Sequence, residues 1–316
     1  MNKDANTPVI VIHGGAGTIL RDKMTPELEE EIRATLEGSL KIGYAILQRG
    51  GSALDAVQRA INIMEDSPLF NAGKGAVFTH EGHNEQDATI VDGATGQVGS
   101  VAGVRHIRNP INLARMVMSR SPHVLLAGDG AESFALSQGM TLVDDQYFFT
   151  DRRYKQLEAV QLAEKKDPDD PQNRLGLSED DRSGTVGAVA LDQDGHLAAA
   201  TSSGGMTNKR WGRVGDSALI GAGTWADKRV AISATGHGEF FMRAVTAYDV
   251  AARMKYAGMP LSEACAASMK QTGPDGTGGF IALDNEGHIE LPFNTTGMYR
   301  GYLLPGAQPW VGIFEE

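Results

Sequence analysis

Apolar residues recur at helical spacing through the first part of the chain. In residues 27–48 they fall on one side of a predicted helix, at Leu28, Ile32, Leu36, Leu40 and Leu47. Gly50 and Gly51 end this helix, and Ser52 is a suitable N-cap for a second helix that runs to about Met64. The pattern also predicts helices over residues 110–120 and 130–138.

The second part of the chain shows strand patterns instead. A short apolar run at 9–12, leading into a glycine-rich turn at 13–17, already predicts one buried strand near the start. Residues 185–191 and 197–202 then read as a hairpin around Asp194-Gly195, and 280–283 with 288–291 as another around Glu286-Gly287. A helix is predicted over 239–256. Helices and hairpins in this order predict one layered α+β domain spanning 1–316.

Residues 155–182 differ from both patterns. They are dense in charged side chains, contain Pro168 and Pro171, and have almost no aromatic or β-branched residues. Such a segment buries too little surface to offset its ordering entropy. We therefore predict a mobile linker over about 155–184. Long structureless segments inside a compact domain usually serve a function.

Composition narrows the function classes. The chain is 41% hydrophobic and 22% charged, which is typical of a globular protein. Its net charge of -11 argues against nucleic-acid binding, which needs basic patches. The N-terminal apolar run is too short for a signal peptide or a membrane span, so we expect a cytoplasmic protein without membrane contact. A single cysteine, Cys265, excludes an intrachain disulfide.

The junction between the linker and the hairpin carries the most chemistry. There Gly184 precedes Thr185, which opens a buried strand. Glycine adopts backbone angles closed to other residues, so its carbonyl can face the next hydroxyl. Attack by that hydroxyl, followed by hydrolysis of the ester, would give chains 1–184 and 185–316. The new α-amine, with a pKa of about 7.7–8.0, would then be the base for its own hydroxyl. The junction alone is better explained by a threonine that merely opens a strand.

Motifs elsewhere in the sequence favour the self-cleavage interpretation of this junction. The chain resembles the plant-type asparaginase and isoaspartyl peptidase family of N-terminal-nucleophile (Ntn) hydrolases over nearly its whole length. The resemblance rests on IHGGAG from Ile12, PLFNAGKG from Pro68, GTVGAVALD from Gly184, TSSGGMTNK from Thr201, GRVGDS from Gly212, ATGHGE from Ala234 and PFNTTGM from Pro292. It implies a four-layer αββα sandwich, self-cleavage into α and β chains, and hydrolysis of asparagine and β-aspartyl dipeptides.

Two pairs of residues are candidates for substrate binding and charge stabilisation. Arg213 suits a carboxylate and Asp216 an ammonium group, so together they suit an α-amino acid; a surface ion pair is the alternative. The Thr235 hydroxyl and the Gly236 N–H suit an oxyanion, while helix capping by Thr235 is the alternative. The resemblance favours the catalytic and substrate-binding roles in both pairs.

The resemblance assigns further features of the site and the assembly. Ser203 stands where the family usually has threonine, whose hydroxyl supports the nucleophile, and Asn71 helps to position that nucleophile. The loop from His13 braces the cleavage site. A structural sodium ion, with no cofactor for catalysis, is implied on backbone carbonyls of one loop, at Met64, Glu65, Ser67, Phe70, Ala72 and Lys74. Lys74 stands where bacterial relatives carry an apolar residue. Pairing of two αβ units is also implied.

The sequence suggests three alternative functions. His13-Gly14-Gly15 resembles an esterase oxyanion loop, but no G-x-S-x-G nucleophile motif occurs in the sequence. A glycosylasparaginase-like amidase would keep the family and change the substrate. A non-catalytic αββα protein that binds aspartate-like ligands would remain uncleaved.

Overall fold

Two β-sheets form the centre of the computed structural model, which describes residues 7–167 and 184–315. The larger sheet has the strand order β12-β11-β1-β5-β6-β2-β3-β4, and the smaller has the order β10-β9-β8-β7. Neighbouring strands are antiparallel except β3 and β4. The large sheet contains β1 (Val9–Gly17), β2 (Gln86–Asp92), β3 (Val98–Val104), β4 (Leu125–Ala127), β5 (Val186–Leu191), β6 (Leu197–Ser203), β11 (Gly297–Leu303) and β12 (Trp310–Gly312). The small sheet contains β7 (Thr224–Ala226), β8 (Val230–Gly236), β9 (Gly278–Asp284) and β10 (Ile289–Glu290).

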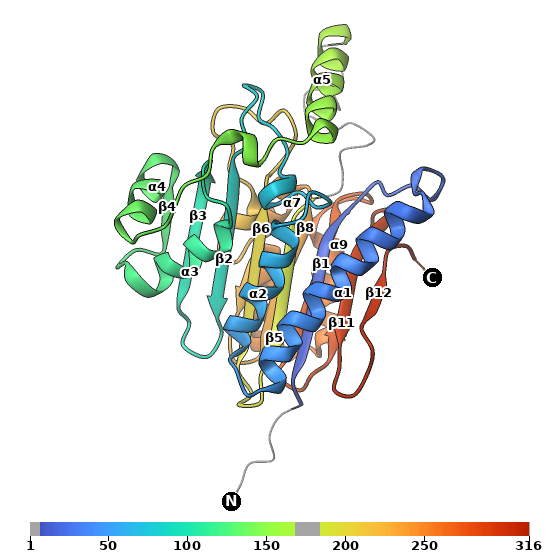
Figure 1. Cartoon of the computed structure of the whole chain (residues 1–316). Helices are drawn as coiled ribbons and strands as arrows, with labels where there is room; N and C mark the ends of the chain where they lie inside the picture. The colour runs from blue at the N-terminus through green and yellow to red at the C-terminus, as the bar shows by residue number, and fades with distance from the viewer. Residues whose placement is uncertain (1–6, 168–183, 316) are drawn as a thin grey trace, which may run out of the picture.

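Helices lie against both sheets (Figure 1). Helix α1 (Pro26–Gln48) contacts β1 and β11, α2 (Ala53–Glu65) contacts β5 and β6, and α3 (Pro110–Arg120) contacts β2 and β3. Helix α4 (Gly128–Ser137) contacts β3 and β4, while α8 (Thr246–Ala257) and α9 (Leu261–Thr272) contact the small sheet. The other helices within the described residues are α5 (Asp151–Lys166), α7 (Gly238–Ala244) and the 3-10 turns η1 (Arg21–Lys23), η2 (Gly73–Gly75), η3 (Asp145–Tyr147) and η4 (Asp216–Ala218).

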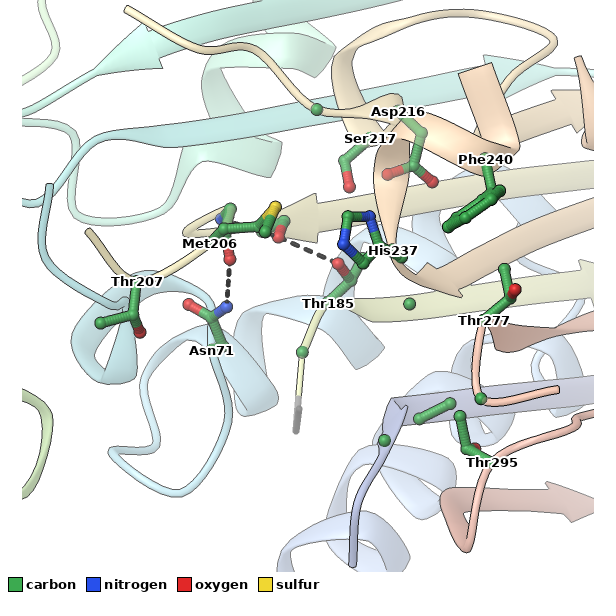
Figure 2. Close-up of a pocket in the computed structure, with 18 of the residues that line it drawn as sticks. Asn71, Thr185, Met206, Thr207, Asp216, Ser217, His237, Phe240, Thr277 and Thr295 are labelled. Atoms are coloured by element: carbon green, nitrogen blue, oxygen red, sulfur yellow. Dashed lines mark hydrogen bonds between the residues drawn. The ribbon is translucent and has the colours of Figure 1, made fainter. Parts of the chain in front are cut away.

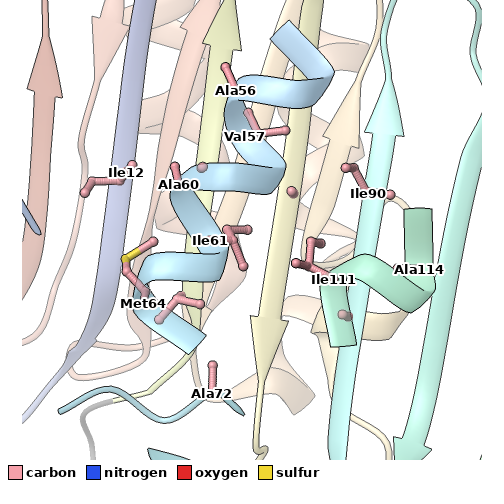
Figure 3. Close-up of a cluster of buried hydrophobic side chains, with 14 of the residues drawn as sticks. Ile12, Ala56, Val57, Ala60, Ile61, Met64, Ala72, Ile90, Ile111 and Ala114 are labelled. Carbon is pink, nitrogen blue, oxygen red and sulfur yellow. The ribbon is translucent and has the colours of Figure 1, made fainter. Parts of the chain in front are cut away.

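Three apolar clusters hold these elements together. One lies between α1, α2, α3 and the large sheet, where Val57, Ile61 and Met64 of α2 are fully buried (Figure 3). The second lies between the two sheets and includes Val11, Val189 and Ile281. The third lies between the small sheet and α8 and α9. Burial of apolar surface is the main favourable contribution to folding. No helix in the described residues is long and apolar enough to cross a membrane.

The mixed α+β class is confirmed, and so are the helices with the strongest periodicity. Helix α1 covers the predicted 27–48, and its N-cap Thr25 accepts a hydrogen bond from the Leu28 N–H. Ser52 caps α2 as predicted, by accepting from the Asp55 N–H. The hairpin of β5 and β6 is also found.

The expected single helix over 239–256 is wrong. The chain breaks at Val245, whose φ of 51° and ψ of 46° are left-handed, and this residue separates α7 from α8. The N–H groups of Ala247 and Tyr248 donate to the carbonyls of Ala222 and Gly221 instead of continuing the preceding turn. Tertiary hydrogen bonds therefore outweigh helical propensity at this point.

The prediction of a mobile linker from residue 155 is also wrong for its first part. Residues 151–166 form α5, and its Arg153, Leu157 and Val160 are buried at i, i+4 and i+7. The Arg153 Nε donates to the Gly75 carbonyl at 2.8 Å. Near the other end of the helix, Arg210 makes a bidentate ion pair with Glu164. The rest of the predicted linker, 168–183, lies outside the described residues.

Candidate active site

Thr185 lies at a cavity of about 270 Å³ (Figure 2). It directly precedes β5 and is buried, and its Oγ1 donates to the Ser203 Oγ at 2.9 Å. Pairing of Val186 with Ser202 brings the start of β5 beside the end of β6 and so brings the two hydroxyls together. The cavity is also lined by Ala16, Gly17, Asn71, Gly184, Gly205, Met206, Thr207, Arg213, Gly215, Asp216, Ser217, Gly236, His237, Phe240, Pro274, Asp275, Gly276, Thr277 and Thr295.

Asn71 acts on this site through the backbone. Its Nδ2 donates to the Gly205 carbonyl at 2.7 Å, and its Oδ1 accepts from the Val77 N–H at 2.9 Å. The Gly205 N–H in turn donates to the Ser203 Oγ at 3.0 Å. Asn71 and Ser203 thus hold opposite sides of Gly205, and Ser203 carries the contact to Thr185.

Thr235 and Gly236 form the end of β8, and they differ in exposure to the cavity. Gly236 lines it with a φ of +136°, and a Cβ there would collide with the Thr277 carbonyl. Thr235 is fully buried, and its Oγ1 accepts from the Ala16 N–H at 3.1 Å. That oxygen lies 3.6 Å from where a Cβ on Gly184 would stand. The Thr235 hydroxyl therefore sits beside the residue that precedes Thr185.

Arg213 and Asp216 both line the cavity, but an unpredicted residue joins them. The Arg213 Nε and Nη2 donate to the two carboxylate oxygens of Glu239, each at 2.9 Å. The Nη1 lies toward Gly205 and Gly215, since it is 3.4 and 2.8 Å from the positions of Cβ atoms built on them. Burial raises the pKa of Glu239, but hydrogen bonds from His237 and Arg213 outweigh this and hold it well below its usual value.

Asp216 differs from its neighbours in having a carboxylate oxygen without a partner. Its Oδ2 is buried and accepts no hydrogen bond from any described residue. Burial raises the pKa of Asp216 to about 7, while the nearby Arg213 charge acts in the opposite direction. A buried acceptor left in this state is costly unless a ligand supplies the missing donor. A substrate ammonium group is a donor of the required charge.

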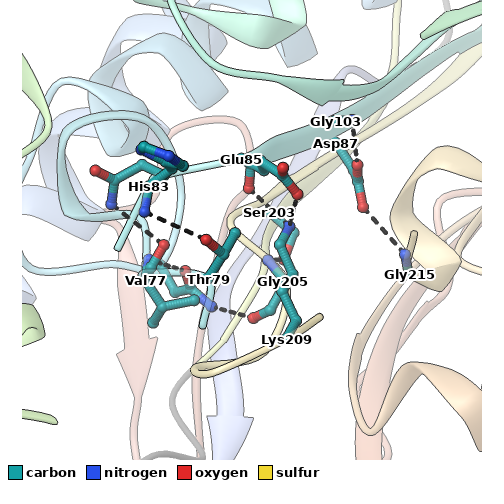
Figure 4. A network of polar contacts seen from close by, with 12 residues as sticks. Val77, Thr79, His83, Glu85, Asp87, Gly103, Ser203, Gly205, Lys209 and Gly215 are labelled. Atoms are coloured by element: carbon teal, nitrogen blue, oxygen red, sulfur yellow. Dashed lines mark hydrogen bonds and ion pairs between the residues drawn. The ribbon is translucent and has the colours of Figure 1, made fainter. Parts of the chain in front are cut away.

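A second buried network supports the loop that carries Arg213 and Asp216 (Figure 4). The Asp87 carboxylate accepts from the Gly215 N–H at 3.0 Å and from the Gly103 N–H at 2.9 Å. The Lys209 Nζ, almost fully buried, donates to the Glu85 carbonyl at 2.9 Å. Burial lowers the pKa of Lys209, although the Asp87 and Glu85 charges oppose this. Asp87, Lys209 and Glu239 were not predicted. Lys209 and Glu239 end two of the quoted motifs, but the residues that they contact lie elsewhere in the sequence.

The glycine-rich run after His13 is not a turn, contrary to the prediction. It continues β1 to Gly17, with a bulge between His13 and Gly15. Gly15 has a φ of +119°, and a Cβ on it would lie 2.6 Å from the Gly184 nitrogen and 2.8 Å from the Gly184 oxygen. The His13 Nδ1 lies 3.0 Å from the Thr185 carbonyl oxygen. This strand therefore packs directly against the predicted cleavage point.

The proposed sodium loop extends from the end of α2 through η2. A Cβ on Gly73 would collide with the Glu65 carbonyl oxygen, and one on Gly75 with the Phe70 carbonyl oxygen. The Glu65 and Phe70 carbonyl oxygens therefore pack closely against the backbone of residues 73–75. The carbonyls of Met64 and Ala72 accept backbone hydrogen bonds. The Lys74 Nζ lies 5.9 Å from the centre of the Tyr147 ring.

Comparison with known proteins agrees with the resemblance seen in the sequence. A family model described as asparaginase matches residues 6–313. A protein of Escherichia coli (strain K12) named isoaspartyl peptidase is 50% identical over 98% of this chain and 96% of its own length. One of the same name from Salmonella typhimurium is 50% identical over 98% of this chain and all of its own. An Arabidopsis thaliana protein named probable isoaspartyl peptidase/L-asparaginase 2 is 40% identical over 97% of this chain and 98% of its own.

Proposed function

The chain belongs to the asparaginase family and is a hydrolase, and on this premise we propose that it is an isoaspartyl peptidase with L-asparaginase activity. We further propose that it matures by cutting itself between Gly184 and Thr185. The observation that carries both proposals is the placement of Thr185. Its hydroxyl donates a hydrogen bond to Ser203 at the edge of a cavity. Gly184, the residue before it, packs closely against Gly15 and Thr235.

Self-cleavage begins with attack of the Thr185 Oγ on the Gly184 carbonyl carbon. The C–N bond of that peptide then breaks, the nitrogen takes up the hydroxyl proton, and an ester links Gly184 to Thr185. This step already frees the amine of Thr185. Water then hydrolyses the ester, which leaves a carboxylate on Gly184 and restores the hydroxyl of Thr185. The Thr235 hydroxyl accepts a hydrogen bond from Ala16, so its own proton remains available to the developing oxyanion.

Turnover uses the same hydroxyl with the new amine as its base. The substrate's α-carboxylate faces the Arg213 guanidinium and its ammonium group faces Asp216, which directs the side-chain carbonyl to Thr185. The oxyanion is held by the Gly236 N–H and the Thr235 hydroxyl. Ammonia or a peptide amine leaves with the proton that the Thr185 amine took up. Water then hydrolyses the acyl-enzyme and releases aspartate.

Three finer features belong to this proposal. The packing of helices on both sheets supports the αββα sandwich of the Ntn hydrolases. A sodium ion would be held by carbonyls of the 64–74 loop and would stiffen the segment that carries Asn71; a melting temperature unchanged when sodium is replaced by choline would exclude it. Two αβ units would pair, which sedimentation of the mature protein would show.

Substrate assays separate this proposal from its alternatives. Purified protein should release aspartate from a β-aspartyl dipeptide and from asparagine. Faster release from glycosylasparagine than from either would favour the glycosylasparaginase-like alternative. A protein that binds aspartate, hydrolyses none of the three and gives a single band on a denaturing gel would be the non-catalytic alternative.

Ser203 offers a direct test of how the nucleophile is supported. Threonine has a methyl group that restricts its rotamer, so its hydroxyl should point toward Thr185 for a larger fraction of the time. Self-cleavage of Ser203→Thr should therefore be several-fold faster than that of the parent on a gel time course. Ser203→Ala, which lacks the hydroxyl, should be slower. If Ser203→Thr cleaves itself no faster than the parent, the side-chain rotamer at position 203 does not control the rate of self-cleavage.

A further inference from the structure

A row of polar side chains crosses the apolar interface between the two sheets. On the large sheet, His13 pairs with Gly187 and Gly187 pairs with Thr201, so the three positions lie side by side on β1, β5 and β6. On the small sheet, Ser233 of β8 pairs with Thr224 of β7. We call His13, Thr201, Thr224 and Ser233 the polar belt. All four are fully buried.

Hydrogen bonds join the polar belt into one chain that ends at the nucleophile. The Thr224 and Thr201 hydroxyl oxygens are 2.6 Å apart, and those of Thr201 and Ser233 are also 2.6 Å apart. The Ser233 Oγ lies 2.8 Å from the His13 Nε2. The other ring nitrogen, Nδ1, lies 3.0 Å from the Thr185 carbonyl oxygen. This series of hydrogen bonds thus runs from β7 across the interface between the two sheets to Thr185.

The Thr185 carbonyl at the end of this series fixes which group donates and which accepts in each hydrogen bond. A carbonyl can only accept, so the His13 Nδ1 must carry a proton. Burial lowers the pKa of His13 to about 3, against a smaller upward effect of the Thr185 carbonyl, so the ring is neutral and its Nε2 is an acceptor. Ser233 must then donate to Nε2 and accept from Thr201, which accepts from Thr224. One tautomer satisfies the whole chain.

The backbone leaves room for this contact at one place. A Cβ on Gly187 would collide with both the Ser233 Oγ and the His13 Nε2. Glycine inside a strand loses packing and backbone entropy, and it often marks a close approach by another group. Here the hydrogen bond between His13 and Ser233 passes over Gly187. Glycine at position 187 of β5 therefore leaves the space that this hydrogen bond needs.

We propose that His13, held by the polar belt with its Nδ1 protonated, is a positioning residue that sets the Thr185 nucleophile through the carbonyl of Thr185. This inference rests on the proposed function, because it assigns a role only if Thr185 is the nucleophile. Fixing that carbonyl limits rotation about the Thr185 backbone and so directs both the hydroxyl and the future amine. The amino-acid end of the substrate is bound elsewhere, by Arg213 and Asp216.

Two substitutions at His13 test the roles of its two ring nitrogens separately. The amide of Asn reaches the place of Nδ1, and the amide of Gln reaches that of Nε2. His13→Asn should keep the donor to Thr185 and retain most of the activity. His13→Gln should lower kcat and the rate of self-cleavage about 10- to 100-fold with little change in KM, because a misplacement of about 1 Å costs about 100-fold in rate. A His13→Gln variant as fast as His13→Asn would overturn the positioning role.

The second measurement does not depend on activity. In full-length protein labelled with ¹⁵N-histidine, the His13 ring should give the spectrum of a neutral imidazole protonated at Nδ1. Ser233→Ala should shift the Nε2 resonance, while Ser39→Ala should leave it unchanged, because the Ser39 hydroxyl donates to the Ala60 carbonyl. An active parent with His13 protonated at Nε2 would overturn the inference. A parent inactive on every substrate would instead overturn the proposed function.

Discussion

Thr185→Ala should leave the chain whole and abolish hydrolysis. The variant lacks the hydroxyl that attacks Gly184 during maturation, so the amine that would act as base never forms. Loss of a catalytic nucleophile in other hydrolases costs about 10⁶-fold in kcat, and we expect a loss of about 10⁵-fold or more. The measurement is aspartate release from a β-aspartyl dipeptide, with a denaturing gel of the same preparation.

Thr185→Ser is the matched control for this variant. It keeps a hydroxyl and, after cleavage, an amine on the same residue, so it should still self-cleave and hydrolyse substrate at a reduced rate. Thr185→Ala with activity within tenfold of the parent would show that another residue performs the attack.

Asp216→Asn should lower kcat/KM about 10- to 150-fold, mainly through KM. The buried Oδ2 of Asp216 has no partner among the described residues, and a substrate ammonium group would fill that place. A hydrogen bond to a charged group contributes about 1.5–3 kcal/mol, which converts to this range. Steady-state kinetics with a β-aspartyl dipeptide measure it. An unchanged KM would mean that the ammonium group binds elsewhere.

The same residue gives the pH profile a defined shape. The ionised form of Asp216 is required to bind an ammonium group, and its pKa is raised to about 7. The Thr185 amine must be neutral, and its reference pKa is about 7.7–8.0. Both groups must therefore lose a proton, so kcat/KM of the parent should fall with a slope approaching two as the pH drops below about 7. In Asp216→Asn only the amine titrates, and the slope should approach one.

Much of the fold could be predicted where a pattern is local. Helix α1 was predicted because its apolar positions repeat along one face, and the hairpin of β5 and β6 because its turn is marked by Asp194-Gly195. Helix α5 was missed because its buried face includes Arg153, which a sequence pattern counts as a surface residue. The buried guanidinium of Arg153 is stabilised by hydrogen bonds that it donates to the Gly75 carbonyl and to the Gln156 Oε1. The strands β2 and β3 were not predicted at all.

Only the site residues that lie in recognisable sequence motifs could be predicted. Thr185 was found at the junction with Gly184 and Gly236 as an oxyanion donor, and the resemblance favoured both roles. The resemblance also assigned Ser203 and Asn71, and all four residues line one cavity. Thr235 lies behind the cavity wall, beside Gly184. Asp87 could not be found from sequence, because its contact with Gly215 joins residues 128 positions apart. Glu239, which occupies two nitrogens of Arg213, depends in the same way on how α7 packs.

Maturation at Thr185 is the step on which all of this chemistry depends, and intact-mass analysis of the purified full-length protein tests it most directly. We predict two chains, residues 1–184 and 185–316, with Thr185 as the first residue of the second. Folded protein that still gives one uncut chain of 316 residues after several days of incubation would contradict it.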